Sequence, residues 1–375
     1  MYIPYEKIGA LFKKVTNDES VSNFFYNRKI LQNVSYIEKN KPKVLKRLNK
    51  KLLKGEKLNV VFYVYDETKW KCQSLYDLLL EDERFTVKVL VTKTACLNKD
   101  NPSYITNDSL KKTYDFFKQI GVKVELAYDV NKLKFMPFKK FKPDIIFYQH
   151  PWYVKTEQGP VVCSKFALTA YVPYYFPIET AGIDCNLRFH QYIENYYVFD
   201  EYTKNKYLRE NPKLGKTLKV AGYPYLDYFV NRERSEGDCI IYAPHWTVGG
   251  EGLAYSTFEW SGQFMLEYAK SHPEIKWVFK PHPLLKKALV DTNTMTVEEV
   301  ESYYAEWNNL GVNYEGGNYL EFFAKSKMMI TDCSSFLGEY FITEKPLIHL
   351  MSKGSQFRTS DNPILKTYYR ADNLD

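Results

Sequence analysis

The most constraining feature of this sequence is a repeated alternation of short apolar runs with segments of helical periodicity. The apolar runs of the first half cover residues 58–66, 85–92, 122–129, 144–150, 170–174 and 196–199, and those of the second half cover residues 238–246, 275–283, 312–316, 328–335 and 346–350. Runs that are apolar on both faces and alternate with helices are typical of parallel strands covered on two sides. The sequence therefore predicts an α/β fold with doubly wound parallel sheets.

The alternation is interrupted once, near the charged stretch NRERSEGD at residues 231–238. A chain of 375 residues is too long for one ordinary core. We therefore expect two facing Rossmann-like domains, at residues 58–230 and 237–360. Residues 1–57 are expected to form a helical, basic N-terminal extension. Residues 361–375 are expected to form a C-terminal helix that could cross back to the first domain.

A basic amphipathic helix is predicted at residues 42–57. Lysines and an arginine occupy one side, and the other side carries Val44, Leu45, Leu48, Leu52 and Leu53. Such a helix can lie on an anionic membrane surface, or it can pack on the first domain with its charges in solvent. Both interpretations stay open at this point.

The composition is that of a folded, mildly basic protein. Lys and Arg outnumber Asp and Glu by 52 to 45, which fits anionic small molecules and not a protein that coats nucleic acid. The six cysteines are scattered without a CxxC pair, so buried free thiols in a reducing compartment are expected. The sequence starts without the pattern of a signal peptide, and no stretch approaches the ~18 apolar residues of a membrane span. We therefore expect a cytoplasmic protein, with peripheral membrane association through residues 42–57 as an open alternative.

Polar residues follow three predicted strands of the second half. His245 ends the first of these strands, Lys280 and His282 end the second, and Asp332 and its neighbours end the third. In open α/β sheets, ligands bind beyond the carboxyl ends of the strands. The sequence therefore predicts a polar crevice edge made by three strand ends.

A cation and an imidazole separated by a proline can bind a diphosphate and neutralise charge on a leaving nucleotide. Lys280 and His282 have this arrangement, although a histidine–proline pair can also simply make a turn. Ser334 and Ser335 stand between a strand and a helix, where one of them would cap the helix and the free N–H groups would favour an anion. Pure capping is the competing interpretation, and the two are compatible.

The remaining candidates each have a structural alternative. Glu339 lies one helical turn beyond the serines and could accept from ribose or polyol hydroxyls, or could be a surface glutamate. His245 precedes a loop with Thr247 and two glycines, which suits the donor side of a site, but a structural histidine fits as well. His150 ends a strand of the first domain and could serve as a general base.

The absence of several motifs narrows the chemistry. The sequence has no GxxxxGK[ST] phosphate loop and no convincing GxGxxG after a strand. These absences argue against a P-loop kinase, an ATPase or a dehydrogenase. It also has no HExxH motif, no Cys/His ligand cluster and no acidic pair after a strand. We therefore expect a transfer reaction without a metal or other cofactor, in which protein cations neutralise the phosphates.

In residues 220–346 the sequence resembles the CDP-glycerol glycerophosphotransferase family, which includes teichoic-acid and capsule polymerases. The matching motifs, in order, are VAGYPYLD from Val220, IYAPHW from Ile241, FKPHP from Phe279, and TDCSS from Thr331 continuing to Lys345-Pro346. Each motif alone is weak, but four in series are fairly specific. The resemblance implies a GT-B fold whose C-terminal domain holds the donor.

The resemblance also implies the reaction and its residues. A polyol phosphate, foremost glycerol phosphate, would move from a CDP-polyol to a hydroxyl of a capsule, teichoic-acid-like or other cell-surface glycan, releasing CMP. His282 would contact the donor pyrophosphate, Ser334 and Ser335 the phosphate, and Asp332 and Glu339 the polyol or ribose hydroxyls.

The sequence departs from the family pattern in three places. His245 replaces the threonine of the family's Tyr-Ala-Pro-Thr-Trp, and Glu339 replaces an aspartate. The family's Trp-His-Gly, which carries its presumed base, has no counterpart here. Either His150 takes that role or the acceptor chemistry differs. Two alternatives therefore remain: a GT-B glycosyltransferase that uses a nucleotide sugar, and a non-catalytic protein that binds nucleotides or glycans.

Overall fold

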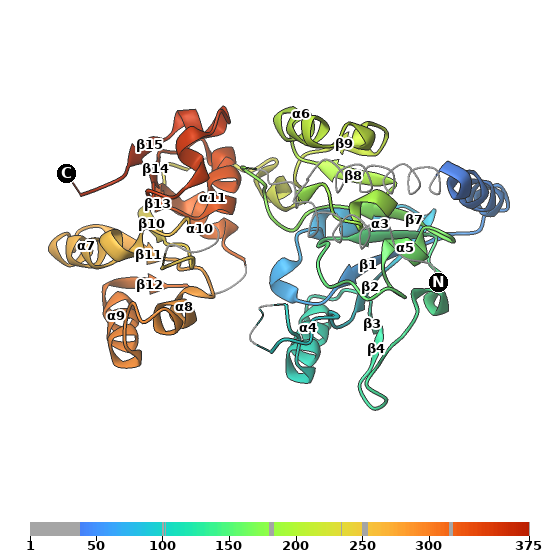
Figure 1. Ribbon diagram of the computed structural model, residues 1–375, viewed down its shortest axis with the longest axis horizontal. Helices are drawn as coiled ribbons and strands as arrows, with labels where there is room; N and C mark the ends of the chain where they lie inside the picture. The colour runs from blue at the N-terminus through green and yellow to red at the C-terminus, as the bar shows by residue number, and fades with distance from the viewer. Residues whose placement is uncertain are drawn as a thin grey trace, which may run out of the picture. The chain divides into compact units, whose positions relative to one another are not determined.

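The chain consists of two compact units in the computed structural model (Figure 1). The structure describes residues 38–99, 101, 103–179, 184–233, 235–249, 254–314 and 318–374. Unit 1 comprises Met1–Tyr174 and Ala181–Gly222, and unit 2 comprises Tyr175–Thr180 and Tyr223–Asp375. The predicted extension over residues 1–57 is described only from residue 38 onward.

The division between the units falls earlier than the predicted boundary between residues 230 and 237. It lies after Gly222, and the short 3-10 helix η6, Pro224–Phe229, already belongs to unit 2. The physical reason is packing, because Tyr225, Leu226, Tyr228 and Phe229 lie against the apolar core of unit 2.

A parallel sheet, sheet A, forms the centre of unit 1. Within the described residues its strand order is β3-β2-β1-β6-β7-β8-β9. These strands are β1 Leu58–Val64, β2 Phe85–Val91, β3 Val124–Leu126, β6 Ile145–Tyr148, β7 Leu168–Tyr171, β8 Asn195–Val198 and β9 Leu218–Val220. The connecting segments include α3 Gln73–Glu81, α4 Asn107–Gln119, α5 Pro160–Cys163, α6 Glu201–Glu210 and the small hairpin of β4 Tyr128–Asp129 and β5 Lys134–Phe135. The buried runs form the central strands because side chains on both faces are covered; β1 is buried at all but one position.

The helix at residues 38–53 packs on unit 1. Val44 and Leu48 are buried against Leu58, the first residue of β1. On the same helix, Arg47 and Lys51 each place a side-chain nitrogen 2.5 Å from a carboxylate oxygen of Asp144, which is fully buried just before β6. Of the two interpretations of this helix, the structure shows packing on the first unit. Leu53, however, is 88% exposed.

A second parallel sheet, sheet C, forms the centre of unit 2, in the order β12-β11-β10-β13-β14-β15. Its strands are β10 Cys239–Ala243, β11 Lys276–Phe279, β12 Gly311–Asn313, β13 Ser326–Thr331, β14 Leu347–Leu350 and β15 Tyr369–Ala371. Helices cover both faces: α7 Phe258–Ser271, α8 Leu285–Asp291, α9 Val297–Leu310, α10 Leu320–Lys325 and α11 Ser334–Glu339. In Figure 1, α7 lies on one side of this sheet and α10 and α11 on the other.

Alternate residues of β10 supply two separate apolar cores. Ile241 faces the core that contains residues of α10 and α11, whereas Tyr242 faces the core that contains residues of α7 and α9. This alternation is the pleat of a strand buried on both sides. Every predicted apolar run contains or overlaps a strand, so the prediction of two doubly wound parallel sheets is confirmed.

The C-terminal segment differs from the prediction. Residues 361–375 were expected to form a helix, but the described part contains a short 3-10 helix, η9 Ile364–Thr367, and then β15, which pairs in parallel with β14. The segment belongs to unit 2. The strand is short and mostly exposed at the sheet edge, so it lacks the apolar run that identifies a central strand.

Two other sequence expectations can be compared with the described residues. All six cysteines are free and buried, as predicted. No helix in the described ranges is long and apolar enough to cross a membrane.

Candidate functional site

Three adjacent strands of sheet C bring the predicted site residues to one edge. Strand β10 pairs in parallel with β11 on one side and with β13 on the other. Tyr242 is in register with Phe279, and Ala243 with Thr331. His245, Lys280 and Asp332 therefore follow neighbouring strand ends, at the edge where open α/β sheets bind ligands.

His245 and His282 form the centre of this edge. Their ring centroids lie 5.2 Å apart, and the Trp246 ring lies 6.0 Å from that of His282. His282 is half-buried, and its Nδ1 accepts the backbone N–H of Leu284 at 3.1 Å. Because Nδ1 accepts a hydrogen bond here, Nε2 of His282 carries the ring hydrogen in the neutral form and can donate to an anion.

His245 is more deeply buried and is held by its own loop. Its Nδ1 accepts the Thr247 N–H at 3.3 Å and lies 3.0 Å from the Thr247 hydroxyl. Burial lowers the pKa of His245 to about 3, so the ring is neutral at physiological pH. The Thr247 hydroxyl also accepts the N–H groups of Tyr255 and Ser256. Thr247 therefore fixes the loop that carries His245.

Asp332 has a different environment from the one that the sequence suggested. One carboxylate oxygen accepts the His245 N–H at 2.6 Å, and the other accepts the Thr257 N–H at 2.6 Å and the Thr257 hydroxyl at 2.8 Å. Burial raises the pKa of Asp332 to about 6, against the opposing effect of these donors. The carboxylate thus ties the β13 end to both ends of the 245–257 loop, and both oxygens are already engaged.

An aromatic enclosure surrounds Lys280. Its ammonium lies 5.7–5.9 Å from the ring centroids of Tyr314, Tyr319 and Phe336, a distance at which cation–π attraction operates. The residue is only 4% exposed. Glu339, also buried, accepts a hydrogen bond from the Tyr319 hydroxyl. The enclosure therefore brings a buried cation and a buried carboxylate to the same tyrosine.

The two serines do not cap the helix as predicted. The residue at the N-cap of α11 is Cys333, which makes no side-chain cap hydrogen bond, and Ser334 and Ser335 are the first two helical residues. Both are half-buried, and among the described residues neither hydroxyl has a hydrogen-bond partner. Helix α11 begins one residue earlier than a cap by Ser334 would require. Neither serine hydroxyl is therefore used to cap the helix.

His150 lies in unit 1, at the carboxyl end of β6. Its Nδ1 is 3.1 Å from the Trp152 carbonyl, and its ring packs edge-on against Tyr65 with centroids 3.9 Å apart. Nε2 is buried and has no hydrogen-bond partner in the described part of the chain. Burial, aided by the charge of Lys69, holds the pKa of His150 well below its usual range.

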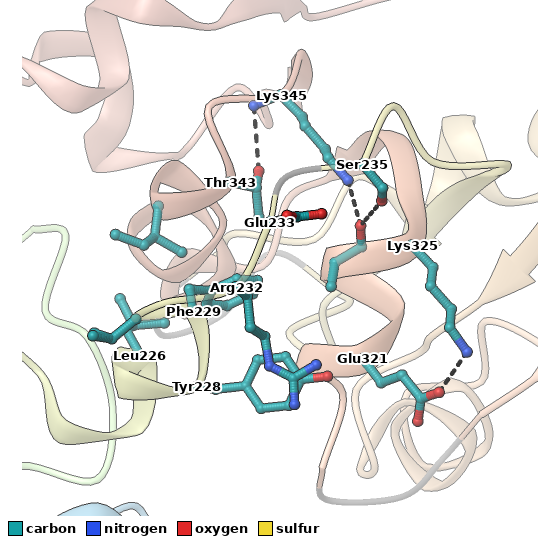
Figure 2. Close-up of a pocket in the computed structure, with 13 residues that line it drawn as sticks. Leu226, Tyr228, Phe229, Arg232, Glu233, Ser235, Glu321, Lys325, Thr343 and Lys345 are labelled. Atoms are coloured by element: carbon teal, nitrogen blue, oxygen red, sulfur yellow. Dashed lines mark hydrogen bonds and ion pairs between the residues drawn. The ribbon is translucent and has the colours of Figure 1, made fainter.

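Unit 2 also has a cavity away from this edge. This cavity has a volume of about 770 Å³ and lies between η6, the segment before β10, and the end of α10. Figure 2 shows its lining residues. Ser235 and Lys345 both donate to the Ala324 carbonyl in its wall, at 3.0 and 2.6 Å. These residues precede β10, β13 and β14, so the cavity opens at the amino edge of sheet C, opposite Lys280 and His245.

Some residues of the carboxyl edge were not identified from the sequence. Tyr319 and Tyr314 lie in a connection without a motif, and Tyr255 contacts His245 with ring centroids 5.5 Å apart. No local signal marks these tyrosines, because their neighbours come from distant strand ends. Gly250, in the predicted glycine loop, lies outside the described residues. No group of three or more His, Cys, Asp or Glu side chains in the described ranges is placed to hold a metal ion.

Comparison with known proteins identifies the fold. No protein-family model and no curated protein sequence matches this chain. The structure of S. aureus MnaA with UDP is similar, with a TM-score of 0.51 and 11% identity over 78% of each chain. A structure of UDP-N-acetylglucosamine 2-epimerase also has a TM-score of 0.51, with 14% identity over 84% of each chain.

A variant of the wall teichoic acid polymerase TagF gives a TM-score of 0.48 at 13% identity, over 83% of this chain and 78% of that one. This value is too low to carry an argument about the fold. The two better matches and the parallel sheets A and C agree on one architecture. The chain has a GT-B fold built from two Rossmann-like units.

Proposed function

We propose that this protein is a transferase that moves a polyol phosphate, foremost glycerol phosphate, from a CDP-polyol to a hydroxyl of a cell-surface glycan. The observation that carries the proposal is the meeting of His245, Lys280 and His282 at the ends of two adjacent parallel strands of unit 2. Sequence motifs at the same strand ends resemble those of CDP-glycerol glycerophosphotransferases. A buried ammonium beside hydrogen-bond donors suits a diphosphate donor.

Each residue of the edge has a defined part in this proposal. His282 donates from Nε2 to the donor pyrophosphate, and Lys280 supplies a positive charge from its aromatic enclosure. The hydroxyls of Ser334 and Ser335 hydrogen-bond the transferred phosphate, and Glu339 accepts from a polyol or ribose hydroxyl. Asp332 is a positioning residue, because its oxygens hold the backbone of the loop that carries His245 and Thr247.

The chemical step is an in-line displacement at phosphorus. The acceptor oxygen bonds to the β-phosphorus, and the bond from that phosphorus to the bridging oxygen breaks, so CMP leaves with the bridging oxygen. The acceptor proton passes to a base. His150 is our candidate, because a neutral ring with Nδ1–H directed at the Trp152 carbonyl has its lone pair on Nε2. Its burial means that acceptor binding must open a path to Nε2.

Substitution of His282 tests the proposed donor contact. His282→Ala should lower kcat/KM for CMP release from CDP-glycerol by about 10²–10³-fold, because one preorganised donor to the leaving group is lost. His272→Ala is the matched control, since His272 lies at the end of α7 and contacts the Tyr268 carbonyl. Unchanged turnover in His282→Ala would show that the assigned contact is wrong.

A nucleotide sugar is the second candidate donor. It is favoured by the fold similarity to a structure solved with UDP. Thermal unfolding with CDP-glycerol, CDP-ribitol and UDP-N-acetylglucosamine separates the candidates, since a ligand at 100 times its Kd stabilises the folded state by about 2.7 kcal/mol. Stabilisation by CDP-glycerol alone supports the proposal, stabilisation by the UDP-sugar alone supports a glycosyltransferase, and stabilisation by none of them contradicts both.

A further inference from the structure

A small cavity of about 130 Å³ lies in unit 1, which we call the amino-edge cavity. The charged and buried polar residues in its walls include Glu38, Lys41, His190, Glu194, Asn211, Lys213 and Lys216. Glu194 directly precedes β8 and Thr217, also in the wall, directly precedes β9, whereas His150 follows the end of β6. The cavity is therefore at the amino edge of sheet A, a strand length of about 13 Å from the edge that carries His150.

Three buried side chains of this cavity have polar atoms without a partner. Nε2 of His190, Oε2 of Glu194 and Nδ2 of Asn211 make no hydrogen bond within the described part of the chain. The residues are 1%, 2% and 4% exposed. Buried polar groups in folded proteins are nearly always hydrogen-bonded, because an unpaired one costs about 1–3 kcal/mol. Three such atoms in the walls of one cavity indicate a bound polar ligand.

The hydrogen-bond partners of the other atoms define what the unpaired atoms can do. Nδ1 of His190 accepts the Leu187 N–H at 3.2 Å, so the ring hydrogen is on Nε2, and burial lowers the His190 pKa to about 3. Oδ1 of Asn211 accepts the Lys213 N–H at 3.3 Å, so its free atom is the amide nitrogen. Both unpaired nitrogens are therefore hydrogen-bond donors, which excludes their use as metal ligands in this arrangement.

The charges around the cavity also favour an anion. Three lysines face two glutamates, and one lysine is already used, because Lys216 pairs with Glu38 at 2.7 Å. Lys41 and Lys213 also line the cavity, together with Glu194. Burial raises the pKa of Glu194 to about 7, with Lys41 opposing the shift, so this carboxyl can take up a proton near neutral pH. A protonated Glu194 adds a third donor and removes the negative charge.

We propose that the amino-edge cavity binds a small tetrahedral oxyanion of the phosphate class, held by His190 Nε2, Asn211 Nδ2, Glu194 and the flanking lysines. Its volume equals that of about four waters, which suits one such ion and not a nucleotide. This site is separate from the donor edge of unit 2 and does not depend on the proposed function.

Calorimetric titration with sodium sulfate at constant ionic strength tests the site, because sulfate does not titrate between pH 6 and 8. The titratable and charged groups that face Glu194 across the cavity are Glu38, Lys41, His190, Lys213 and Lys216. If binding requires the Glu194 proton, sulfate affinity should fall about tenfold from pH 6 to pH 8. Glu194→Gln should bind at both pH values without this change.

Two further variants test the other donors. Asn211→Asp keeps the oxygen that accepts the Lys213 N–H but replaces the donor with a negative charge, so binding should be lost while the melting temperature shows an intact fold. Lys41→Ala should weaken binding, and Lys50→Ala, an exposed lysine on the same helix, should not. Inorganic phosphate and glycerol phosphate then show whether the cavity admits a monoester.

The outcomes that overturn the proposal are specific. They are an absence of sulfate binding by the unmodified protein at pH 6, a pH dependence that persists in Glu194→Gln, and unchanged binding by Asn211→Asp. Preferential binding of a neutral polyol over sulfate would also overturn it, since the lysines would then have no part in recognition.

Discussion

At the scale of single residues, the candidate site separates groups that can contact a ligand from groups that position them. His282, Ser334 and Ser335 are half-buried at the strand ends, and their polar atoms are suited to contact a phosphate. Asp332 and Thr247 are buried, and their oxygens accept backbone N–H groups of the same loop. The sequence identified all five residues but could not tell these two classes apart, because the donors of Asp332 come from residues 75 and 87 positions away.

The positioning role of Asp332 leads to a prediction about stability. Asp332→Asn should lower the free energy of unfolding by about 2–4 kcal/mol, because an amide nitrogen would face the Thr257 N–H or the His245 N–H and leave it unsatisfied. Urea unfolding measures the change. Asp291→Asn is the control; this aspartate forms an exposed pair with Lys287, and its loss should change stability by less than about 0.5 kcal/mol. Equal stability of both variants would contradict the assigned role.

At the scale of elements, the basic helix at residues 38–53 shows how two interpretations of one pattern are resolved by packing. Its apolar residues Val44 and Leu48 are used against β1, and two of its basic residues meet buried Asp144. A membrane contact by this helix remains our proposal only for the exposed part, where Leu53 lies.

The ion pairs of this helix give the second stability prediction. Asp144 is fully buried, and hydrogen bonds from Lys51, the Asn59 N–H and Arg47 hold its pKa below the usual range although burial opposes them. Replacing both Arg47 and Lys51 with Met should therefore cost about 3–5 kcal/mol at pH 7, since the carboxylate loses its cations. Because a lowered carboxyl pKa stabilises the fold only where the group is ionised, this cost should be full above the pKa of Asp144 in the unfolded chain and should shrink as the pH falls through its lower pKa in the folded chain.

Denaturant unfolding at pH 7 and at about pH 3, below the unfolded aspartate pKa of about 3.9, measures both effects. Lys50→Met, on the same helix, is the control and should leave stability nearly unchanged. A cost that is the same at both pH values would show that the two residues stabilise the helix by packing and not by charge.

At the scale of the whole molecule, buried titratable groups determine how stability depends on pH. Burial lowers the pKa values of four histidines, those of His190 and His245 to about 3 and that of His349 to about 4, with His150 also well below its usual range. These rings stay neutral in the folded chain and become charged in the unfolded one below about pH 6.5. Glu194 and Asp332 act oppositely, since burial raises their pKa values to about 7 and about 6.

The histidines outnumber the two carboxyls, so the folded state should lose stability on acidification. Between pH 6 and pH 5 the unfolded chain holds about two more bound protons than the folded one, so the loss should be about 2–3 kcal/mol per pH unit. Calorimetry across this range measures the apparent Tm. His349→Phe should flatten the slope, because His349 packs edge-on against Phe357 and its charging no longer opposes folding. A Tm that is constant or rises on acidification would contradict this account.

The sequence by itself determined most strands of the two doubly wound sheets, the buried thiols and the residues at the carboxyl edge of unit 2. These features follow from local apolar patterns and from residue types next to strand ends, which the chain carries at fixed positions. The edge strands β9 and β15 were not predicted, because exposed strands lack the continuous apolar run that identifies a buried strand.

Only the tertiary structure decided what the polar residues do. Strand pairing places β10 between β11 and β13, and this order brings His245 beside His282 and gives Asp332 its backbone donors. The same is true of the amino-edge cavity, where His190, Glu194 and Asn211 are close only because β8, β9 and α6 pack together. Burial and hydrogen-bond partners depend on which distant segments meet, and no local pattern in a single sequence records them.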